Sequence, residues 1–467
     1  MNYIEQLGKA AKASKKSIAT AGTAKKNELL EKIAENLRKN IDVILKENEK
    51  DTAMAKENGI TDAMVDRLRL TPERINDIAD ACIYLTGLND PVGEVIEGYT
   101  RPNGMRITKT RVPMGVIGII FESRPNVTVD AATLCIKSGN AAILRGGKEA
   151  INSNKILMDI MRESVEECGL PKDIIQLVED TSRESSNQMM RANGYIDVLI
   201  PRGGKGLIKA VVENATVPVI ETGSGNCHIY IDESADIDMA VSVTNNGKTQ
   251  RPSVCNALET CLVHKSVAKE FLPKLMEEFK KFNVDVRGCE RTVEILGEGI
   301  KPATEEDYAT EFDDYIMAVK VVDDIDEAIE HISEYSTGHS ECIITNDLKN
   351  AEKFQREIDS ACVYVNCSTR FTDGGEFGFG AEIGISTQRL HARGPMGLRE
   401  LTTMKYLING DGQIRKYGKG KGNGIKSRKS DKEFRRKKSY KRCGLLVRER
   451  KNIWAAGKKR CRKDNAF

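Results

Sequence analysis

Short apolar runs alternate with helical segments along most of this chain. From residue 114 onward the order is MGVIGIIF, a helical DAATLCIKSG, NAAILRGG, a helix, DIIQLVED, a helix, YIDVLIPRGG, a helix from Lys205, and VPVIE. A second series after Cys255 contains ETCLVH, MAVKVVDD, ECIITND and ACVYVN, again with helices between them. This alternation is typical of parallel sheets with crossover helices. Because 467 residues exceed what one core usually organises, we predict an α/β fold with two stacked α/β domains.

The segments around this alternation carry other patterns. Residues 4–57 place apolar side chains at helical spacing, which predicts long amphipathic helices at the start of the chain. A further helix is expected near Thr71, where threonine and proline resemble a cap and a first turn. Between residues 93 and 112 two short runs flank Pro-Asn-Gly, which is a hairpin signal. We expect this hairpin and the late run LTTMKYLI to form a small β element.

The apolar runs and the cysteines indicate the compartment. No run reaches the roughly 20 apolar residues that a bilayer helix requires. The N-terminus MNYIEQLGKAAKASKK also lacks the apolar block of a secretory signal. Twelve cysteines occur singly in a long chain, which favours reduced thiols over a disulfide framework. We therefore predict a cytoplasmic protein that does not contact membranes.

Charge is divided sharply between the body of the chain and its end. The last 51 residues hold 20 Lys and Arg against 4 Asp and Glu, whereas the rest holds 52 basic and 65 acidic residues. Low hydrophobicity with dense like charge predicts a disordered basic tail over residues 416–467. Such a tail could bind nucleic acid or an anionic membrane through counterion release. We favour an incidental extension without a role, because basic composition alone carries no sequence-specific readout.

One cysteine lies in a polar loop just ahead of an apolar strand. The segment GKTQRPSVCNALET places Cys255 near Lys248 and Arg251. The thiolate is the attacking form of cysteine, and nearby cations favour it. The other interpretation is a small buried thiol, which describes most of the remaining cysteines. Cys255 is thus a candidate nucleophile, and its local context leaves both interpretations open.

Three glycine-containing turns follow predicted strands. In VIETGSGN the carboxylate of Glu221 ends a strand, which is where open α/β sheets bind substrates. In IPRGGKGLI the turn with Gly203 and Gly204 precedes a helix whose free N–H groups suit a phosphate. In AAILRGGKEA the cations Arg145 and Lys148 follow a strand and could favour the extra phosphate of NADP. Each turn also has an ordinary alternative as a solvated connection, because glycine turns are common.

Two other kinds of chemistry find little support in the sequence. The five histidines never occur in ligand-spaced pairs with Cys or His, so no metal site is expected. A G-x-S-x-G elbow is also missing, which disfavours a Ser-His-Asp hydrolase. Neither metal chemistry nor serine hydrolysis is therefore predicted.

Taken in order, these segments resemble the aldehyde dehydrogenase superfamily. The resemblance covers residues 1 to about 415 and is carried by VPMGVIGIIFESRPNVTVDAATLCIKSGNAAILRGGKEA, IPRGGKGLI, VIETGSGN, QRPSVCNA, VYVNCSTRFTDGGEFGFGAEIGISTQRLHARGPMGL and LTTMKY. It implies a Rossmann-like NADP-binding domain over residues 1–92 and 113–224 and a catalytic domain over residues 225–400. It also implies a β oligomerisation element made from residues 93–112 and 401–415.

The same resemblance assigns roles to single residues. Cys255 becomes the nucleophile, and Asn126 matches the asparagine of the oxyanion hole. Glu311 matches the carboxylate that holds the nicotinamide ribose. Glu221 matches the general base of the superfamily, which serves hydrolysis of the acyl-enzyme. A reductase must avoid that hydrolysis, so the role of Glu221 stays open.

Within the superfamily, the resemblance is to the branch that reduces γ-glutamyl phosphate to glutamate 5-semialdehyde with NADPH in proline biosynthesis. That substrate carries a phosphate and a carboxylate, so we expect convergent arginines, the candidates being Arg124, Arg251, Arg370 and Arg393. The implied partners are further copies of the chain, as a dimer or tetramer, and glutamate 5-kinase. The alternatives are a superfamily member that acts on another aldehyde or acyl phosphate, and a nucleic-acid-binding protein that uses the basic tail.

Overall fold

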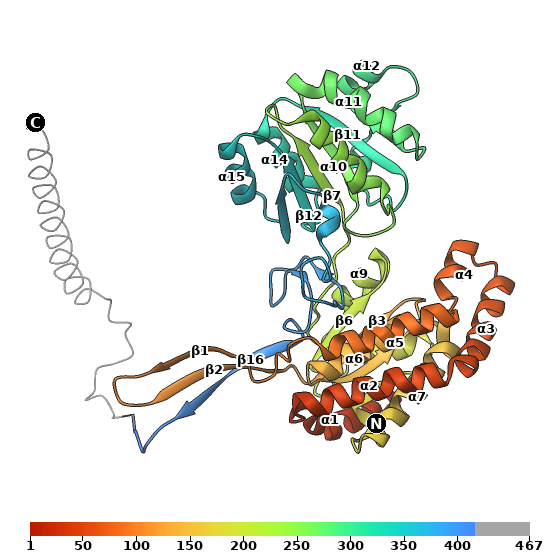
Figure 1. Ribbon diagram of the computed structural model, residues 1–467, viewed down its shortest axis with the longest axis vertical. Helices are drawn as coiled ribbons and strands as arrows, with labels where there is room; N and C mark the ends of the chain where they lie inside the picture. The colour runs from red at the N-terminus through yellow and green to blue at the C-terminus, as the bar shows by residue number, and fades with distance from the viewer. Residues whose placement is uncertain (416–467) are drawn as a thin grey trace, which may run out of the picture. The chain divides into compact units, whose positions relative to one another are not determined.

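The computed structural model describes residues 1–415, apart from the side chains at positions 62 and 63, and begins with five helices (Figure 1). They are α1 (Tyr3–Ala19), α2 (Thr23–Lys39), α3 (Ile41–Glu57), α4 (Asp62–Leu68) and α5 (Pro72–Thr86). Thr71 caps α5 as predicted, because its hydroxyl accepts the N–H of Arg74 and proline fills the first turn. No helix within residues 1–415 combines the length and apolar composition that a bilayer crossing requires. The predicted basic tail lies outside the described residues.

Four parallel strands form the first sheet, in the order β5-β4-β3-β6. The strands are β3 (Val116–Phe121), β4 (Ala141–Arg145), β5 (Ile175–Leu177) and β6 (Val198–Arg202). The helices that follow them are α6 (Asn126–Lys137), α7 (Ile151–Glu167), α8 (Arg183–Met190) and α9 (Lys205–Asn214), with 3-10 turns η1 (Lys148–Ala150) and η2 (Lys172–Ile174). Every residue of the central strand β3 is buried, as expected for a parallel sheet with both faces covered.

The predicted strand VPVIE is reduced to a single bridge between Val219 and Leu199. Leu199 donates its N–H to Pro218 and accepts the N–H of Ile220, so only a short stretch pairs with β6. Proline has no N–H with which to extend this pairing on its other side. The prediction that Glu221 ends a strand is therefore wrong, and Glu221 lies in an extended loop.

Seven parallel strands form a second sheet, in the order β10-β9-β11-β8-β7-β12-β13. The strands are β7 (Cys227–Ile231), β8 (Leu258–His264), β9 (Asp285–Gly288), β10 (Lys301–Pro302), β11 (Ile316–Val322), β12 (Ser340–Ile344) and β13 (Cys362–Val365). The helices are α10 (Ile237–Thr249), α11 (Lys265–Lys280), α12 (Glu290–Leu296), α13 (Glu305–Tyr308), α14 (Ile325–Tyr335) and α15 (Leu348–Glu357). The four strands predicted after Cys255 are present as β8, β11, β12 and β13.

Three antiparallel strands form a separate sheet, in the order β1-β2-β16. They are β1 (Val95–Thr100), β2 (Arg106–Pro113) and β16 (Thr402–Asn409), and a two-stranded pair is formed by β14 (Ile385–Ser386) and β15 (Gly394–Pro395). This arrangement confirms the predicted hairpin and its pairing with LTTMKYLI. Large apolar side chains of the three-stranded sheet are exposed, among them Val95, Tyr406 and Ile408. The oligomerisation role of this sheet stays a prediction.

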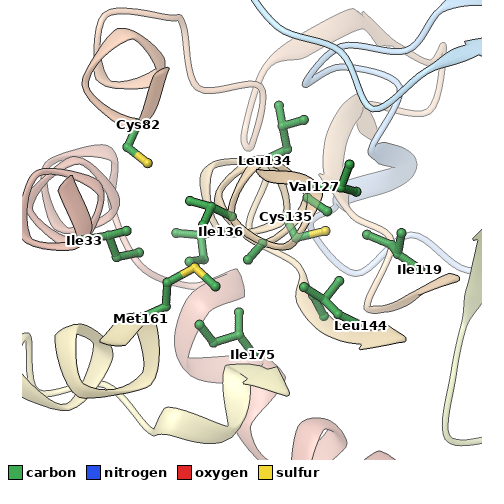
Figure 2. Packing of buried hydrophobic residues seen from close by; sticks show 14 of the residues in the cluster. Ile33, Cys82, Ile119, Val127, Leu134, Cys135, Ile136, Leu144, Met161 and Ile175 are labelled. Atoms are coloured by element: carbon green, nitrogen blue, oxygen red, sulfur yellow. The ribbon is translucent and has the colours of Figure 1, made fainter. Parts of the chain in front are cut away.

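Helix α6 is surrounded by an extensive apolar cluster (Figure 2). Cys135 of α6 faces Ile119 and Leu144 on the first sheet, whereas Ile136 faces the helices α2 and α7. Neither Cys135 nor Ile136 has any exposed surface. This packing fixes the start of α6, where the predicted oxyanion-hole residue Asn126 lies.

Replacing Ile136 by alanine is expected to lower the free energy of unfolding by about 2–5 kcal/mol, because it removes buried carbons and leaves a cavity. Ile83→Ala is a matched control on α5, where the side chain is 39% exposed, and it should change the same quantity by less than about 0.5 kcal/mol. Urea unfolding followed by circular dichroism measures both, and equal midpoints would contradict the packing described here.

Candidate active site

The candidate nucleophile Cys255 lies in the loop between α10, which ends at Thr249, and β8, which begins at Leu258. The carbonyl of Cys255 packs directly against Gly225, where an added Cβ would lie 1.5 Å from the carbonyl oxygen. Only glycine permits so close an approach of two backbones. The thiol of Cys227 donates to the same carbonyl at 3.1 Å. These two contacts fix the backbone of Cys255.

Asn256 anchors the next position of the loop. Its Nδ2 donates to the carbonyls of Arg370 and Thr372 at 3.2 and 2.9 Å. Its own carbonyl accepts the hydroxyl of Thr369 at 2.8 Å. Thr369 and Arg370 belong to the 3-10 turn η3 (Thr369–Phe371). The predicted substrate residue Arg370 is therefore held beside the Cys255 loop.

The surroundings of the Cys255 thiol disfavour its charged form. Cys255 is half-buried as a residue, and desolvation of the thiol raises its pKa to about 12. The carboxyl groups of Glu311 and Glu382 also raise this pKa, whereas Arg202 lowers it. The thiol is therefore protonated at neutral pH, and it needs a proton acceptor before it can attack a carbonyl carbon.

The cationic setting expected from the sequence comes from a different residue. Lys248 forms an ion pair with Glu259 at 2.6 Å, and neither side chain has any exposed surface. Its charge is balanced inside that pair, so the expectation that Lys248 favours the thiolate is wrong. Arg202, at the end of β6, lowers the pKa of Cys255 instead. Arg202 was not predicted from the sequence, because it directly precedes the glycine turn and no local pattern relates it to Cys255.

Three of the four predicted substrate arginines lie close enough to influence one another. Burial lowers the pKa of Arg124, and the positive charges of Arg67, Arg202 and Arg251 lower it further. Burial and the charge of Arg251 also lower the pKa of Arg370. We call Arg124, Arg202, Arg251 and Arg370 the arginine cluster. Like charges that converge in this way suit the binding of an anion.

Arg393 and Glu221 lie together at another place. Arg393 forms an ion pair with Asp359 at 2.7 Å. Glu221, Asp359 and Arg393 line a cavity of about 670 Å³, and Cys255 is not part of its lining. The N–H of Glu221 donates to Oε1 of Gln388 at 3.1 Å. Neither Arg393 nor Glu221 is among the largest causes of the shift in the pKa of Cys255.

Asn126 begins α6, and its amide group is held in one orientation. Its Nδ2 donates to Oδ2 of Asp130 at 2.8 Å, one turn along the helix. Burial raises the pKa of Asp130 to about 6, and the bond from Asn126 and the charge of Arg202 oppose that rise. An amide nitrogen carries two N–H groups, so one remains for an oxyanion.

Glu311 contacts the glycine against which Cys255 packs. Its Oε1 accepts the N–H of Gly225 at 2.7 Å. Burial raises the pKa of Glu311, whereas this hydrogen bond and the charge of Lys205 lower it. Lys205 is the first residue of α9. The predicted ribose carboxylate therefore lies within electrostatic reach of the start of α9.

The turn before α9 leaves the first N–H groups of the helix without a side-chain cap. Gly204 precedes the first helical residue and offers no side-chain cap to the free N–H groups of the first turn. An added Cβ at Gly203 would lie 2.5 Å from the side chain of Glu122, so this position excludes any larger residue unless Glu122 moves. The arrangement suits a phosphate group at the positive end of the helix.

The two cations predicted to select NADP differ in their surroundings. Arg145 donates through Nη2 to the carbonyls of Thr181 and Ser182 at 2.8 and 3.2 Å, so it braces a connection between elements. Lys148 stands at the start of η1 and is exposed. Of this pair, Lys148 is the one placed to meet a phosphate from solvent.

Glu382 is a carboxyl group whose charge acts on Cys255, and it was not predicted from the sequence. Its Oε2 accepts the N–H of Gly374 at 2.9 Å. Burial raises its pKa to about 7, and the charge of Asp373 raises it too, whereas Arg202 and the bond from Gly374 lower it. A group with this pKa gains and loses a proton near neutral pH. No local pattern marks it, because it lies in a glycine-rich loop far from Cys255 in the sequence.

A family model supplies the decisive comparison: the model for the aldehyde dehydrogenase family matches residues 2–295 and 314–406. The chain belongs to the aldehyde dehydrogenase family. It is 59% identical over 414 residues to the gamma-glutamyl phosphate reductase of Clostridium perfringens (strain SM101 / Type A), which covers 89% of this chain and 100% of the relative. The enzyme of the same name from Caldanaerobacter subterraneus is 57% identical over 413 residues, with 88% of this chain and 100% of the relative covered.

A solved structure agrees with the aldehyde dehydrogenase assignment. The crystal structure of gamma-glutamyl phosphate reductase from Thermotoga maritima is 52% identical, with a TM-score of 0.87, and the match covers 89% of this chain and 100% of that one. The predicted α/β fold of this family is confirmed. As an aldehyde dehydrogenase family member the protein is an oxidoreductase that uses a nicotinamide cofactor and a small-molecule substrate. Within residues 1–415, no group of three or more His, Cys, Asp and Glu is arranged to hold a metal.

Alkylation of Cys255 by iodoacetamide should show its raised pKa. We expect the rate to rise about tenfold per pH unit between pH 7 and 10, because only the thiolate reacts and its fraction grows in this way below the pKa. Mass spectrometry of the Cys255 peptide measures the rate, and the half-buried Cys289 provides a second thiol for comparison. A plateau below pH 8 would contradict the protonated thiol.

Proposed function

We propose that the protein reduces γ-glutamyl phosphate to glutamate 5-semialdehyde with NADPH and releases phosphate, as a step of proline biosynthesis. The observation that carries this proposal is 59% identity over the full length of a relative named gamma-glutamyl phosphate reductase. The site supports it, because a cysteine loop beside the arginine cluster suits a substrate with an acyl phosphate and a carboxylate.

Cys255 carries the acyl group in this proposal. Its sulfur forms a bond to the acyl carbon while the carbon–oxygen bond to phosphate breaks, and inorganic phosphate leaves with that electron pair. Glu382 accepts the thiol proton, because its pKa of about 7 matches neutral conditions and it lies within electrostatic reach of the thiol. The free N–H of Asn126 and the amide of Cys255 stabilise the oxyanion.

The residues of the site fit NADPH. The open turn at Gly203 and Gly204 accommodates a phosphate at the start of α9. Lys148 offers an exposed cation to the extra phosphate, and Glu311 offers a carboxylate to the ribose hydroxyls. When bound there, NADPH would supply the hydride that takes the acyl group to the aldehyde level. Cys255 would then be released as the carbon–sulfur bond breaks, with its electron pair returning to sulfur.

The arginine cluster binds the anionic ends of the substrate. Arg124, Arg251 and Arg370 are the members proposed from the sequence, and their mutual repulsion falls when an anion is bound. Arg393 keeps its ion pair with Asp359 and takes no part in this step. Glu221 lies in the cavity with Arg393, where it does not activate water against an acyl group on Cys255. This placement suits a reductase, which must protect its acyl-enzyme from hydrolysis.

The assembly and compartment belong to the same proposal. Exposed apolar side chains on the sheet β1-β2-β16, including Ile96, Tyr99 and Leu407, support a homo-oligomer formed through that sheet. A dimer or tetramer and a contact with glutamate 5-kinase stay predictions. The free cysteines of residues 1–415 support a cytoplasmic, reducing environment.

Cys255→Ala should abolish covalent capture of the substrate. Mass spectrometry of the unmodified protein mixed with an acyl phosphate is expected to show an acyl adduct on Cys255, and the variant should show none and no NADPH oxidation. Cys289→Ala replaces another half-buried free thiol and should retain both. Turnover by the Cys255→Ala variant would exclude the covalent mechanism.

Glu382→Gln should remove the proton acceptor. We expect kcat/KM of the unmodified enzyme to rise through a pKa near 7, and the variant to lose this limb and at least about 100-fold of its activity at pH 7.5. Glu376→Gln changes an exposed carboxyl group of the same loop and should leave the profile intact. An unchanged profile in Glu382→Gln would assign proton transfer to another group.

A further inference from the structure

A buried ion pair spans the two ends of the nucleophile loop. Lys248 lies in the last turn of α10 and Glu259 lies on β8, so residues 250–257, with Cys255 among them, run between the two. Nζ of Lys248 and Oε2 of Glu259 are 2.6 Å apart, and both side chains are fully buried. Burial of two charges costs desolvation energy that an apolar pair of the same size would avoid. Stability alone therefore gives no reason for this pair.

The second oxygen of Glu259 reaches a different segment. Its Oε1 accepts the N–H of Asp313 at 3.3 Å. Asp313 has a φ of 55°, in the left-handed region that side chains other than glycine adopt infrequently. A backbone held in such a conformation needs contacts that specify it. Glu259 supplies one of these contacts. Asp313, which receives it, lies two residues after Glu311 in the chain.

The Glu311 segment returns to the nucleophile by a separate contact. Oε1 of Glu311 accepts the N–H of Gly225 at 2.7 Å, and Gly225 packs on the carbonyl of Cys255. A closed series of contacts thus runs from Glu259 through Asp313, Glu311 and Gly225 to Cys255. The chain from Cys255 to Glu259 on β8 completes it.

We propose that the Lys248–Glu259 pair positions the active site, with Glu259 holding the N–H of Asp313 and so setting where the Glu311 carboxylate stands relative to Cys255. Burial raises the pKa of Glu259 to about 8, and the charge of Lys248 and its hydrogen bond act against that rise. Lys248 thereby orients the carboxyl group of Glu259, and it makes no contact with a ligand. This inference rests on the proposed function, because Glu311 is the group there assigned to the NADPH ribose. The pair is thus a positioning element for cofactor binding.

Two double variants separate positioning from stability. A single replacement would leave one charge buried without its partner, and such a protein often fails to fold. Lys248→Met/Glu259→Gln removes both charges and keeps an acceptor oxygen for Asp313. Lys248→Met/Glu259→Leu removes both charges and the acceptor. Circular dichroism and thermal unfolding establish that both variants are folded.

The dissociation constant of NADPH, measured by its fluorescence, is the first readout. The Gln variant should bind within about threefold of the unmodified protein, whereas the Leu variant should bind about 3- to 10-fold more weakly than the Gln variant, which corresponds to one lost hydrogen bond. In a Glu311→Ala background the two double variants should bind NADPH equally, because the carboxylate that Glu259 positions is gone. A difference that persists without Glu311, or equal binding by the two variants with Glu311 present, would overturn the inference.

The alkylation rate of Cys255 without cofactor is the second readout. The charge of Glu311 raises the pKa of Cys255, so displacement of that carboxylate should speed alkylation of the Leu variant at fixed pH, by about twofold or more relative to the Gln variant. This measurement keeps the two proposals distinguishable. If the unmodified protein binds no NADPH, the proposed function fails, and equal alkylation rates in the two variants would still refute positioning by Glu259.

Discussion

The approach of Gly225 to the carbonyl of Cys255 is the contact on which the site depends. It joins the loop before β7 to the loop before β8, and these strands are neighbours in the second sheet. The candidate nucleophile Cys255 therefore lies at the amino ends of these strands. Arg202 and Glu122, in contrast, stand at the carboxyl ends of β6 and β3 in the first sheet. The site is thus built from the amino ends of strands in the second sheet and the carboxyl ends of strands in the first sheet.

The surroundings of Cys255 favour its protonated thiol. Burial and the carboxyl groups of Glu311 and Glu382 raise its pKa, and Arg202 lowers it. A neutral thiol is a poor target for oxidants as well as a poor nucleophile. In the proposed mechanism an arriving anion neutralises the arginine cluster, so activation of the thiol rests on proton transfer to Glu382. That mechanism uses a thiol that is protonated between turnovers.

The sequence predicted the elements better than the partners of single side chains. Periodic apolar runs identified the helices and most strands, because burial of one face leaves a local pattern. Strand β7 was not predicted, because His228 interrupts its short apolar run CHIYI. Lys248 was misread because its partner Glu259 lies across the loop, and Arg202 and Glu382 were missed because only the fold brings them to Cys255. Pro218 indicates that VPVIE does not extend as a strand, because proline has no N–H for strand pairing.

The three-stranded sheet has a consequence for how the chain is made. Its central strand β2 pairs with β16, and the contact between Arg111 and Arg399 nearby spans 288 positions. Ribosomes add about 5–20 residues per second, so the hairpin waits roughly 15–60 s after its own synthesis with one edge unpaired. An open strand edge can pair with the same edge on another nascent chain, and the cations Arg106, Lys109 and Arg111 on β2 oppose such pairing. Polysomes bring several copies of this hairpin close together, so these charges protect the open edge until β16 is made.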